Sequence, residues 1–278
     1  MEFQDKVALI SGGSSGIGLE TGKLLAERGV QVWLLARNRE RLQSALIEVE
    51  KMCRNPRQHC GTVVADVTDF AQVKDAVAEV TKKCGPPDIV VNSAGDVYPI
   101  LFQNIDDIEV FHKLMKVNYL GTVHVTHACL QPMLKRGSGH IVNISSVYGF
   151  LGGYGYSAYC ASKFAVRGFS DALRAELKPL GIYVSVVFPQ NTDTPQLAAE
   201  NQLKPPVVKF LDTTSTMTPQ AVAKAIVRGI ARRQYVIIPG GESRLLFWLT
   251  NLLGPGTYWI MDRTVAAAKR KVEQKREQ

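Results

Sequence analysis

The sequence of 278 residues predicts an α/β protein with a doubly wound, mainly parallel sheet of seven strands. Two observations predict this fold class. Short apolar runs alternate with longer segments of helical periodicity, and glycine-rich or polar turns follow several of the apolar runs. No polar linker, internal repeat or low-complexity run interrupts the alternation. We therefore predict one domain over residues 1–242, with a long loop region at 189–217, and a separate tail over residues 243–278.

The elements follow one another in strand–helix order. Buried strands usually consist of four to eight apolar residues, and amphipathic helices repeat their apolar positions every three to four residues. A long helix is expected over residues 106–134 with a bend near Asn118, and another over residues 158–180. A third helix is expected over residues 17–28. The strands are expected at residues 7–10, 32–36, 62–65, 89–91, 140–145, 182–187 and 235–238.

The first strand runs into a glycine-rich turn before the first helix begins. The glycines are Gly12, Gly16 and Gly18, in the spacing Gly-x-x-x-Gly-x-Gly. Such a turn lets the backbone approach a phosphate closely, while the helix N-terminus favours negative charge. The alternative is a tight connection whose glycines serve packing alone. The sequence thus predicts a dinucleotide phosphate site whose further members are Ser14, Ser15 and Ile17.

The end of the second strand predicts which dinucleotide is bound. An acidic side chain there would bind the ribose hydroxyls of NAD, but the chain has Arg37, with Arg39 and Arg41 nearby. A guanidinium suits a ribose 2′-phosphate, so we predict NADPH, held by Arg37 and Arg41. The alternative is that Arg37 is a solvated charge at a helix start. Asn38 is a candidate N-cap of that helix.

A tyrosine and a lysine at helical spacing indicate proton chemistry. Tyr159 and Lys163 lie four residues apart near a predicted helix start, and Ser146 follows the strand at 140–145. The lysine should project from the same helix face and lower the pKa of the phenol, while the serine orients a carbonyl. Such a trio suits proton transfer to a ketone oxygen. The alternatives are a surface aromatic–cation pair, and Ser145 in place of Ser146.

Over residues 5–240 the chain resembles the short-chain dehydrogenase/reductases, which have a Rossmann fold. Ser146, Tyr159 and Lys163 fit that family's catalytic trio, and Asn118 fits an asparagine that supports a proton-relay water. Two positions depart from the family pattern, since Ser93 replaces an asparagine and Gln190 replaces a glycine. The resemblance implies further cofactor contacts at Asp66, Val67, Asn92, Ala94, Gly95, Pro189, Thr192 and Thr194, besides Tyr159 and Lys163.

Within the family, the segment from Pro189 to Pro205 is similar to sphingoid ketone reductases. It carries Thr-Asp-Thr-Pro at 192–195, then Glu200-Asn201 and Lys204-Pro205. The resemblance implies reduction of 3-oxosphinganine to sphinganine, a substrate loop within 189–217, and a homodimer or homotetramer paired through long helices. Tyr154 and Tyr156 line the substrate pocket or belong to the core. Two alternatives remain: a steroid, retinol or other lipid-alcohol dehydrogenase, and a non-enzymatic NADP-binding scaffold.

Charge, cysteines and histidines bound the remaining possibilities. The net charge is +8, but the basic residues form no aromatic-interleaved patch, so no nucleic-acid partner is expected. The cysteines are odd in number and contain no Cys-x-x-Cys pair, which favours a reduced cytoplasmic setting. His124 and His127 have no third partner in the pattern, so no metal is expected. The cysteines are Cys53, Cys60, Cys84, Cys129 and Cys160.

The C-terminal tail is strongly apolar and then basic. Residues 245–261 carry Trp, Phe and Tyr among leucines, with a break at Gly254-Pro255-Gly256, and lysines and arginines follow to Arg276. This pattern is typical of an interfacial anchor on anionic lipid. We therefore expect peripheral contact of residues 245–276 with the cytoplasmic face of a membrane. The alternatives are a flap packed on the fold or on a partner subunit, and a true span.

Overall fold

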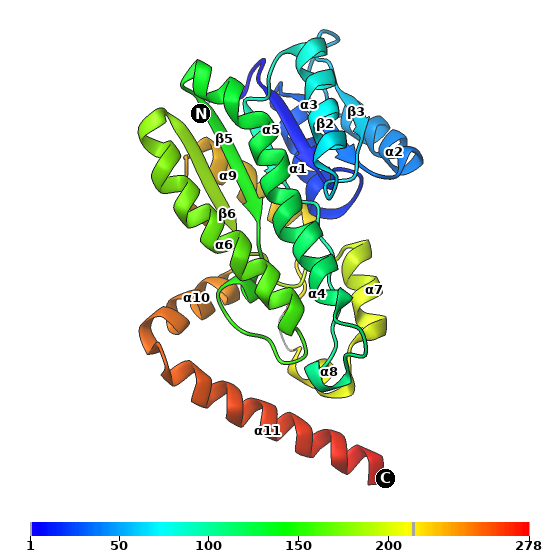
Figure 1. Ribbon diagram of the computed structural model, residues 1–278, viewed down its shortest axis with the longest axis vertical. Coiled ribbons are helices and arrows are strands. Elements are labelled where there is room, and N and C mark those ends of the chain that lie inside the picture. The colour runs from blue at the N-terminus through cyan, green and yellow to red at the C-terminus, as the bar shows by residue number, and fades with distance from the viewer. Residues whose placement is uncertain (1, 213–214, 278) are drawn as a thin grey trace.

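The computed structural model describes residues 2–212 and 215–277 and has the predicted doubly wound α/β architecture (Figure 1). Its sheet has the strand order β3-β2-β1-β4-β5-β6-β7, and every neighbouring pair is parallel. Thr213 and Thr214, in the predicted loop region, and the two terminal residues lie outside the described residues. The strands are β1 (Val7–Ser11), β2 (Gln31–Ala36), β3 (Gly61–Val64), β4 (Ile89–Asn92), β5 (Gly139–Ile144), β6 (Ile182–Val187) and β7 (Val236–Ile237).

Helices cover both faces of the sheet, so the central strands are apolar on both sides. In β1, Ala8 and Ile10 pack into one layer of the core, and Val7 and Leu9 pack into the other. The first layer lies under α1 (Gly16–Ala26), α2 (Arg39–Glu50) and α9 (Pro219–Ala231). The second lies under α3 (Phe70–Cys84), α5 (Gly121–Arg136) and α6 (Ser157–Leu177).

The strand order reverses between β1 and β4, which places a crevice at the carboxyl ends of the strands. From β1 the chain winds outward through β2 to β3, and it then returns to β4 and winds the other way to β7. Ligands of open α/β sheets bind at such a switch point. Short 3₁₀ helices occur at Phe102–Asn104, Val147–Gly149 and Lys178–Leu180.

The predicted bend near Asn118 is a π-helical turn at Met115–Leu120, between α4 (Glu109–Leu114) and α5. The side chain of Asn118 holds this turn in place. Its Nδ2 donates to the carbonyl of Asp96 and to Ser162 Oγ, each at 2.9 Å, and its Oδ1 accepts from Asp96 N at 2.8 Å. The turn is therefore fixed against α6, which carries Tyr159 and Lys163.

The C-terminal tail is two helices that lie against the domain. The predicted break occurs at Gly254, which has a φ of +49° between α10 (Gly241–Leu253) and α11 (Gly256–Glu277). Ala268 and Val272 of α11 are buried, and α11 packs on α8 (Pro206–Leu211), which follows α7 (Pro195–Leu203). The tail thus packs on the fold (Figure 1). Among the described residues, we find no helix with the length and apolar character to cross a bilayer.

Candidate active site

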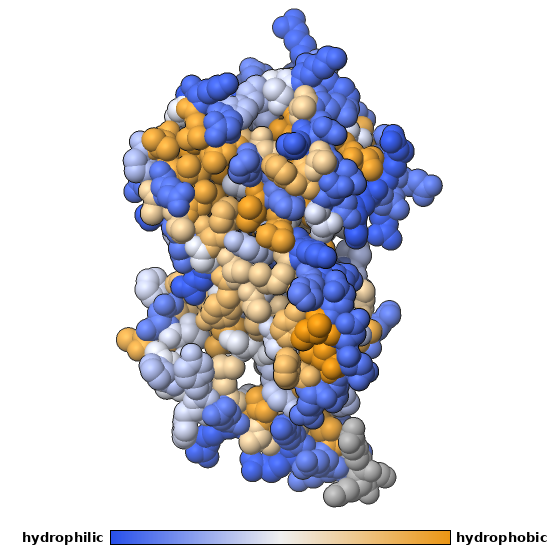
Figure 2. Space-filling view, in the orientation of Figure 1, coloured by the Kyte–Doolittle hydropathy of each residue, from blue (hydrophilic) through white to orange (hydrophobic). Residues whose placement is uncertain are grey.

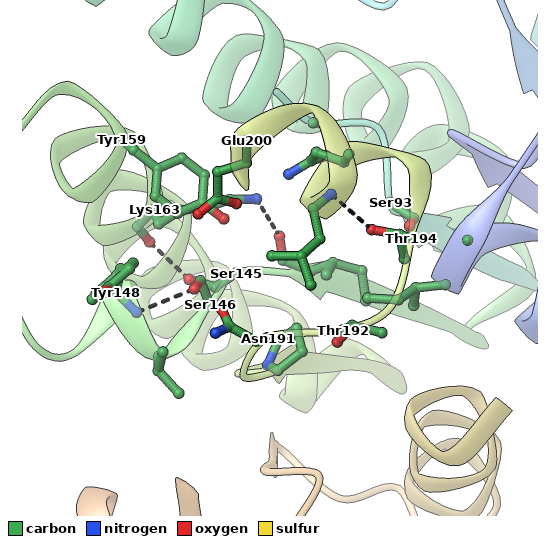
Figure 3. Close-up of a pocket in the computed structure, with 18 of the residues that line it drawn as sticks. Ser93, Ser145, Ser146, Tyr148, Tyr159, Lys163, Asn191, Thr192, Thr194 and Glu200 are labelled. Atoms are coloured by element: carbon green, nitrogen blue, oxygen red, sulfur yellow. Dashed lines mark hydrogen bonds between the residues drawn. The ribbon is translucent and has the colours of Figure 1, made fainter. Parts of the chain in front are cut away.

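A cavity of about 710 Å³ occupies the crevice at the carboxyl ends of the strands. Its lining includes the glycine turn after β1 together with Ser146, Tyr159 and Lys163. Residues of α7, α10 and α11 complete the lining. Figure 3 shows the side chains of Ser146, Tyr159, Lys163 and Glu200 gathered on one side of this cavity. The structure therefore joins the predicted cofactor turn and the predicted catalytic trio in one space.

The glycine turn needs its glycines for close approach. Gly12 has a φ of +68°, and a Cβ there would lie 2.6 Å from the backbone nitrogen of Ala94. A Cβ on Gly18 would lie 2.4 Å from the carbonyl oxygen of Gly12, so Gly18 serves packing and does not line the cavity. No acidic side chain lies in the first turn of α1, which leaves the helix N-terminus favourable for an anion. Ser14, Ser15, Gly16 and Ile17 line the cavity beside Gly12.

Two arginines line the cavity beyond the glycine turn. Arg37 and Arg41 both reach it, and Asn38 caps α2 as predicted by accepting from Arg41 N at 2.8 Å. Arg37 Nη1 lies 3.6 Å from Asp66 Oδ2, and its side chain is 73% exposed. An exposed ion pair of this kind contributes little to stability, so Arg37 can turn towards a phosphate at small cost. Asp66 and Val67 line the same end.

The predicted proton donor lies inside the cavity wall. Tyr159 is buried near the start of α6, and the Ser146 hydroxyl lies close enough to its phenol to favour a lower pKa there. Ser145 has a different partner, because its Oγ donates to the carbonyl of Lys163 at 2.9 Å. The structure therefore places Ser146, and not Ser145, beside the phenol. A ketone oxygen bound there would meet two hydroxyl groups.

Lys163 lies one turn further along α6, as the spacing predicts. Its Nζ donates to the carbonyl of Ile144 at 3.0 Å and lies 5.6 Å from the ring centroid of Tyr159. Burial lowers the pKa of Lys163 from 10.5 to about 8. The ammonium faces both the cavity and Gly95, where a Cβ would lie 3.5 Å from Nζ. The glycine at 95 therefore leaves room for a ligand group beside the lysine.

The predicted lowering of the tyrosine pKa is wrong for this arrangement. Burial raises the pKa of Tyr159 above its usual value, the Ser146 hydroxyl opposes that rise, and the charge of Glu200 adds to it. Lys163 Nζ lies over the ring, 5.6 Å from its centroid, and burial has the larger effect on the pKa of the phenol. The phenol therefore carries its proton at neutral pH, which is the form that an acid must have.

Two predicted site asparagines do not line the cavity. Asn92 Nδ2 donates to Asn143 Oδ1 at 2.8 Å and to Thr126 Oγ1 at 2.9 Å, which ties β4 to β5 and α5. Asn118 acts through the π turn described above. We therefore correct the prediction for Asn92: its side chain is buried between β4, β5 and α5 and does not line the cavity. Of the same motif, Ala94 and Gly95 do reach the cavity, as does Ser93.

The segment after β6 closes over the glycine turn despite its departure from the family pattern. Gln190 does not have positive φ, so the missing glycine costs no backbone strain. Its Nε2 donates to the Ser215 carbonyl at 2.6 Å, and its Oε1 accepts from Ser243 Oγ at 2.6 Å. A Cβ on Gly16 would lie 2.9 Å from Thr194 Cγ2. Pro189, Thr192 and Thr194 all line the cavity.

Three features of the cavity were missed by the sequence analysis. Tyr148 packs on Tyr156 with ring centroids 4.7 Å apart and forms an aromatic wall beside Tyr159. Glu200 lines the cavity and accepts from the hydroxyl of Tyr156 at 2.5 Å. The tail contributes an apolar wall, and the apolar pattern of the sequence did not show which of its side chains would line the cavity. Its members are Leu246, Ile260, Met261 and Val265.

The predicted histidine pair has contacts within the fold. The Nδ1 of His124 hydrogen-bonds the carbonyl of Val67 at 2.8 Å, and the rings of His124 and His127 both pack on Phe70. Within residues 2–212 and 215–277, no group of three or more metal-ligating side chains is present.

Comparison with known proteins places the chain in a family. Residues 6–204 match the family model described as short chain dehydrogenase. The chain is 38% identical to the 3-ketodihydrosphingosine reductase of Bos taurus over 251 residues, which cover 90% of this chain and 75% of the relative. It superposes with a TM-score of 0.75 on a short-chain dehydrogenase from Sphingobium yanoikuyae in complex with NADPH, at 28% identity, covering 92% of this chain and 95% of the other.

A second solved structure has a different dinucleotide. A short chain dehydrogenase/reductase from Burkholderia phymatum in complex with NAD superposes with a TM-score of 0.79 at 22% identity, covering 91% of this chain and 95% of the other. The matched architectures thus include complexes with either dinucleotide, and the choice here depends on the chain's own residues. With its family match, its fold and its joined cavity, this chain belongs to the short-chain dehydrogenase/reductase family of oxidoreductases.

Proposed function

We propose that this protein reduces 3-oxosphinganine to sphinganine with NADPH. The observation that carries the proposal is the continuity of one cavity. Its lining joins the glycine turn, Ser146 and Tyr159, and apolar side chains supplied by the tail. A small ketone would need no such wall, whereas a long alkyl chain gains free energy from it. The relatives named 3-ketodihydrosphingosine reductase support the same substrate.

The residues divide the work of a ketone reduction among them. NADPH, when bound, supplies the hydride that adds to the ketone carbon. Ser146 donates a hydrogen bond to the ketone oxygen, and Tyr159 gives that oxygen its proton, which completes the alcohol. Lys163 binds the nicotinamide ribose and holds a positive charge beside the phenol. Asn118 holds the π turn in place. A water bound beside this turn returns a proton to Tyr159 by way of Lys163.

At the cofactor end, each part of the dinucleotide is assigned to its own group of residues. The backbone of the glycine turn binds the pyrophosphate, with Ser14, Ser15 and Ile17 beside it. Arg37 and Arg41 bind the 2′-phosphate, and Asp66 and Val67 lie against the adenine. Pro189, Thr192 and Thr194 cover the nicotinamide. Because Arg37 and Arg41 both line the cavity and exceed the single carboxylate of Asp66 in charge, we assign NADPH rather than NADH.

A panel of ketones tests the substrate. We expect NADPH oxidation, followed by absorbance, to show kcat/KM for 3-oxosphinganine at least about 100-fold above that for steroid ketones or retinal, since its long alkyl chain gains free energy from the apolar wall. Faster turnover of a steroid ketone or of retinal would contradict the proposed substrate. No oxidation with any ketone would contradict ketone reduction as such.

We further propose that the tail holds the enzyme on the cytoplasmic face of a membrane. Large apolar side chains of α10 and α11 remain exposed, among them Trp248 at 65% and Leu252 at 83%. Basic residues follow along α11, where Arg263 lies over the ring of Trp259 at 4.8 Å, and in Figure 2 hydrophilic and hydrophobic residues alternate over the end of the molecule where α11 lies. This combination suits an anionic lipid surface. The side chain of Arg276 lies outside the described side chains. Pairing of subunits through α5 and α6 stays a prediction.

Vesicle sedimentation tests the membrane contact. We expect the protein to sediment with vesicles of phosphatidylcholine and phosphatidylserine and less with phosphatidylcholine alone, because the basic residues of α11 need anionic lipid. The double variant Trp248→Ser, Leu252→Ser should lose most of this binding. The control is Ile47→Ser, an exposed apolar residue of α2. Sedimentation of the double variant at the wild-type level would refute the contact.

A further inference from the structure

The cavity wall beside Tyr159 holds a buried cluster of charges that the reduction step does not use. Glu200 and Lys204 lie one turn apart on and after α7, and their side chains are only 11% and 2% exposed. Lys204 Nζ lies 3.3 Å from Glu200 Oε1 and also pairs with Asp212 at the end of α8. We name these three residues the α7–α8 ion cluster. Two carboxylates and one ammonium leave it with one excess negative charge.

The excess charge has no cationic partner within the cluster. Lys204 also donates to Asn201 Oδ1 at 2.7 Å, and Asp212 accepts from Asn191. Glu200 accepts a hydrogen bond at 2.5 Å from the hydroxyl of Tyr156, and this hydroxyl carries no charge. A buried charge without a compensating charge is costly, since burial removes its hydration. A cation supplied by a ligand would compensate this excess.

Glu200 and Asp212 both line the cavity, so a ligand can reach the excess charge. The charged residues that line the cavity in the described part of the chain fall into two groups. Arg37, Arg41 and Asp66 lie at the adenine end, and Lys163, Glu200 and Asp212 lie at the ketone end. Lys163 is held by the carbonyl of Ile144 on α6's own side of the cavity. At the ketone end the lining therefore carries two carboxylates and one ammonium.

The position of Glu200 relative to the phenol is also informative. Glu200 accepts from the hydroxyl of Tyr156, whose ring centroid lies 6.2 Å from that of Tyr159, so its carboxylate is one side chain away from the phenol. Figure 3 shows Glu200 beside Tyr159 and Lys163. In 3-oxosphinganine the amino group is on the carbon next to the ketone carbon. A carboxylate this close to the phenol is where that ammonium needs an acceptor.

We propose that Glu200, held by Lys204 and Tyr156, binds the ammonium group of an α-amino ketone substrate and so selects sphingoid ketones over uncharged ketones. This inference rests on the proposed function and adds the basis of its specificity. Asp212 shares the negative charge through Lys204. A steroid ketone or retinal offers no cation to Glu200 and so gains no such attraction. Discrimination thus comes from the attraction between the carboxylate and the ammonium, which an uncharged ketone lacks.

The test compares two substrates in two variants. The substrates are 3-oxosphinganine and its analogue with hydrogen in place of the amino group. In the wild type we expect the amino ketone to be preferred in kcat/KM. In Glu200→Gln, which keeps the shape but removes the charge, kcat/KM for the amino ketone should fall about 10- to 100-fold. Turnover of the amine-free ketone should stay unchanged or rise. The control is Glu27→Gln, an exposed carboxylate at the end of α1.

The outcomes separate this inference from the proposed function. A wild type that turns over both ketones equally, or a Glu200→Gln variant that keeps the wild-type preference, overturns the role of Glu200 while leaving ketone reduction intact. A wild type that reduces neither ketone overturns the proposed function itself. If both substrates lose activity together in Glu200→Gln, the residue is structural and the inference is wrong. Recovery of the preference in Glu200→Asp would support the charge as the cause.

Discussion

Replacing Tyr159 with phenylalanine should reduce kcat/KM for ketone reduction about 10³-fold, equivalent to about 4 kcal/mol of transition-state stabilisation. The change removes only the hydroxyl, so the ring stays in its aromatic wall with Tyr148 and Tyr156. The proton that completes the alcohol would then have to come from water, which is not positioned for the task. NADPH binding, followed by fluorescence, should change little, because the glycine turn and the arginines are untouched.

The burial of the phenol supports this expectation, because it favours the protonated form of Tyr159. Burial raises the pKa of Tyr159, so the wild-type residue is protonated at neutral pH and ready to donate in the reduction direction. The matched control is Tyr183→Phe. Tyr183 lies near the amino end of β6, away from the cavity, and its hydroxyl accepts from Arg233 at 2.9 Å. The control should keep wild-type turnover. A Tyr159→Phe enzyme with more than about a tenth of wild-type activity would remove the tyrosine from the acid role.

Replacing Arg37 with aspartate should change the preferred cofactor from NADPH to NADH. The aspartate repels a 2′-phosphate and can accept hydrogen bonds from the ribose hydroxyls of NADH. It also lies near Asp66, with which Arg37 now pairs at 3.6 Å, so the site becomes strongly negative. We expect the ratio of kcat/KM for NADPH to that for NADH to fall at least about 100-fold, mainly through the loss with NADPH.

The neighbouring helix offers a control with the same change of charge. Arg39 is exposed at the start of α2 and does not line the cavity, in contrast to Arg37 and Arg41. In Arg39→Asp the cofactor ratio should stay within about threefold of wild type, since exposed charges at a distance are screened. Equal ratios in Arg37→Asp and wild type would show that Arg37 is a solvated charge, and the assignment of NADPH would lose its main support.

Local patterns in the sequence predicted the elements that build the cavity. Each strand is a short apolar run, and the spacing of Tyr159 and Lys163 places both on one face of α6 because helical residues four apart are neighbours. The glycine turn was predictable for a similar reason, since close backbone approach allows few other residues. These predictions depend on interactions within about one helical turn or one strand. The residues that make such interactions are close together in the sequence, so their pattern can be recognised there.

Features that depend on contacts between distant segments were not predictable. The α7–α8 ion cluster forms only because the chain turns between α7 and α8 and brings Asp212 back to Lys204. Asn92 faces Asn143 rather than the cavity because β4 and β5 are neighbours in the sheet. The raised pKa of Tyr159 depends on the number of atoms that bury it, which the adjacent lysine does not reveal. The wall made by the tail depends in turn on how α11 packs on α8.

Isotope transfer tests the central claim most directly. The enzyme would be incubated with 3-oxosphinganine and NADPH carrying deuterium at both hydrogens of nicotinamide C4, and the product would be analysed by mass spectrometry. We predict sphinganine that is heavier by one mass unit, with the deuterium on C3, and far less of it from the Tyr159→Phe enzyme. Unlabelled sphinganine, or no sphinganine from a wild-type enzyme that binds NADPH, would contradict the account.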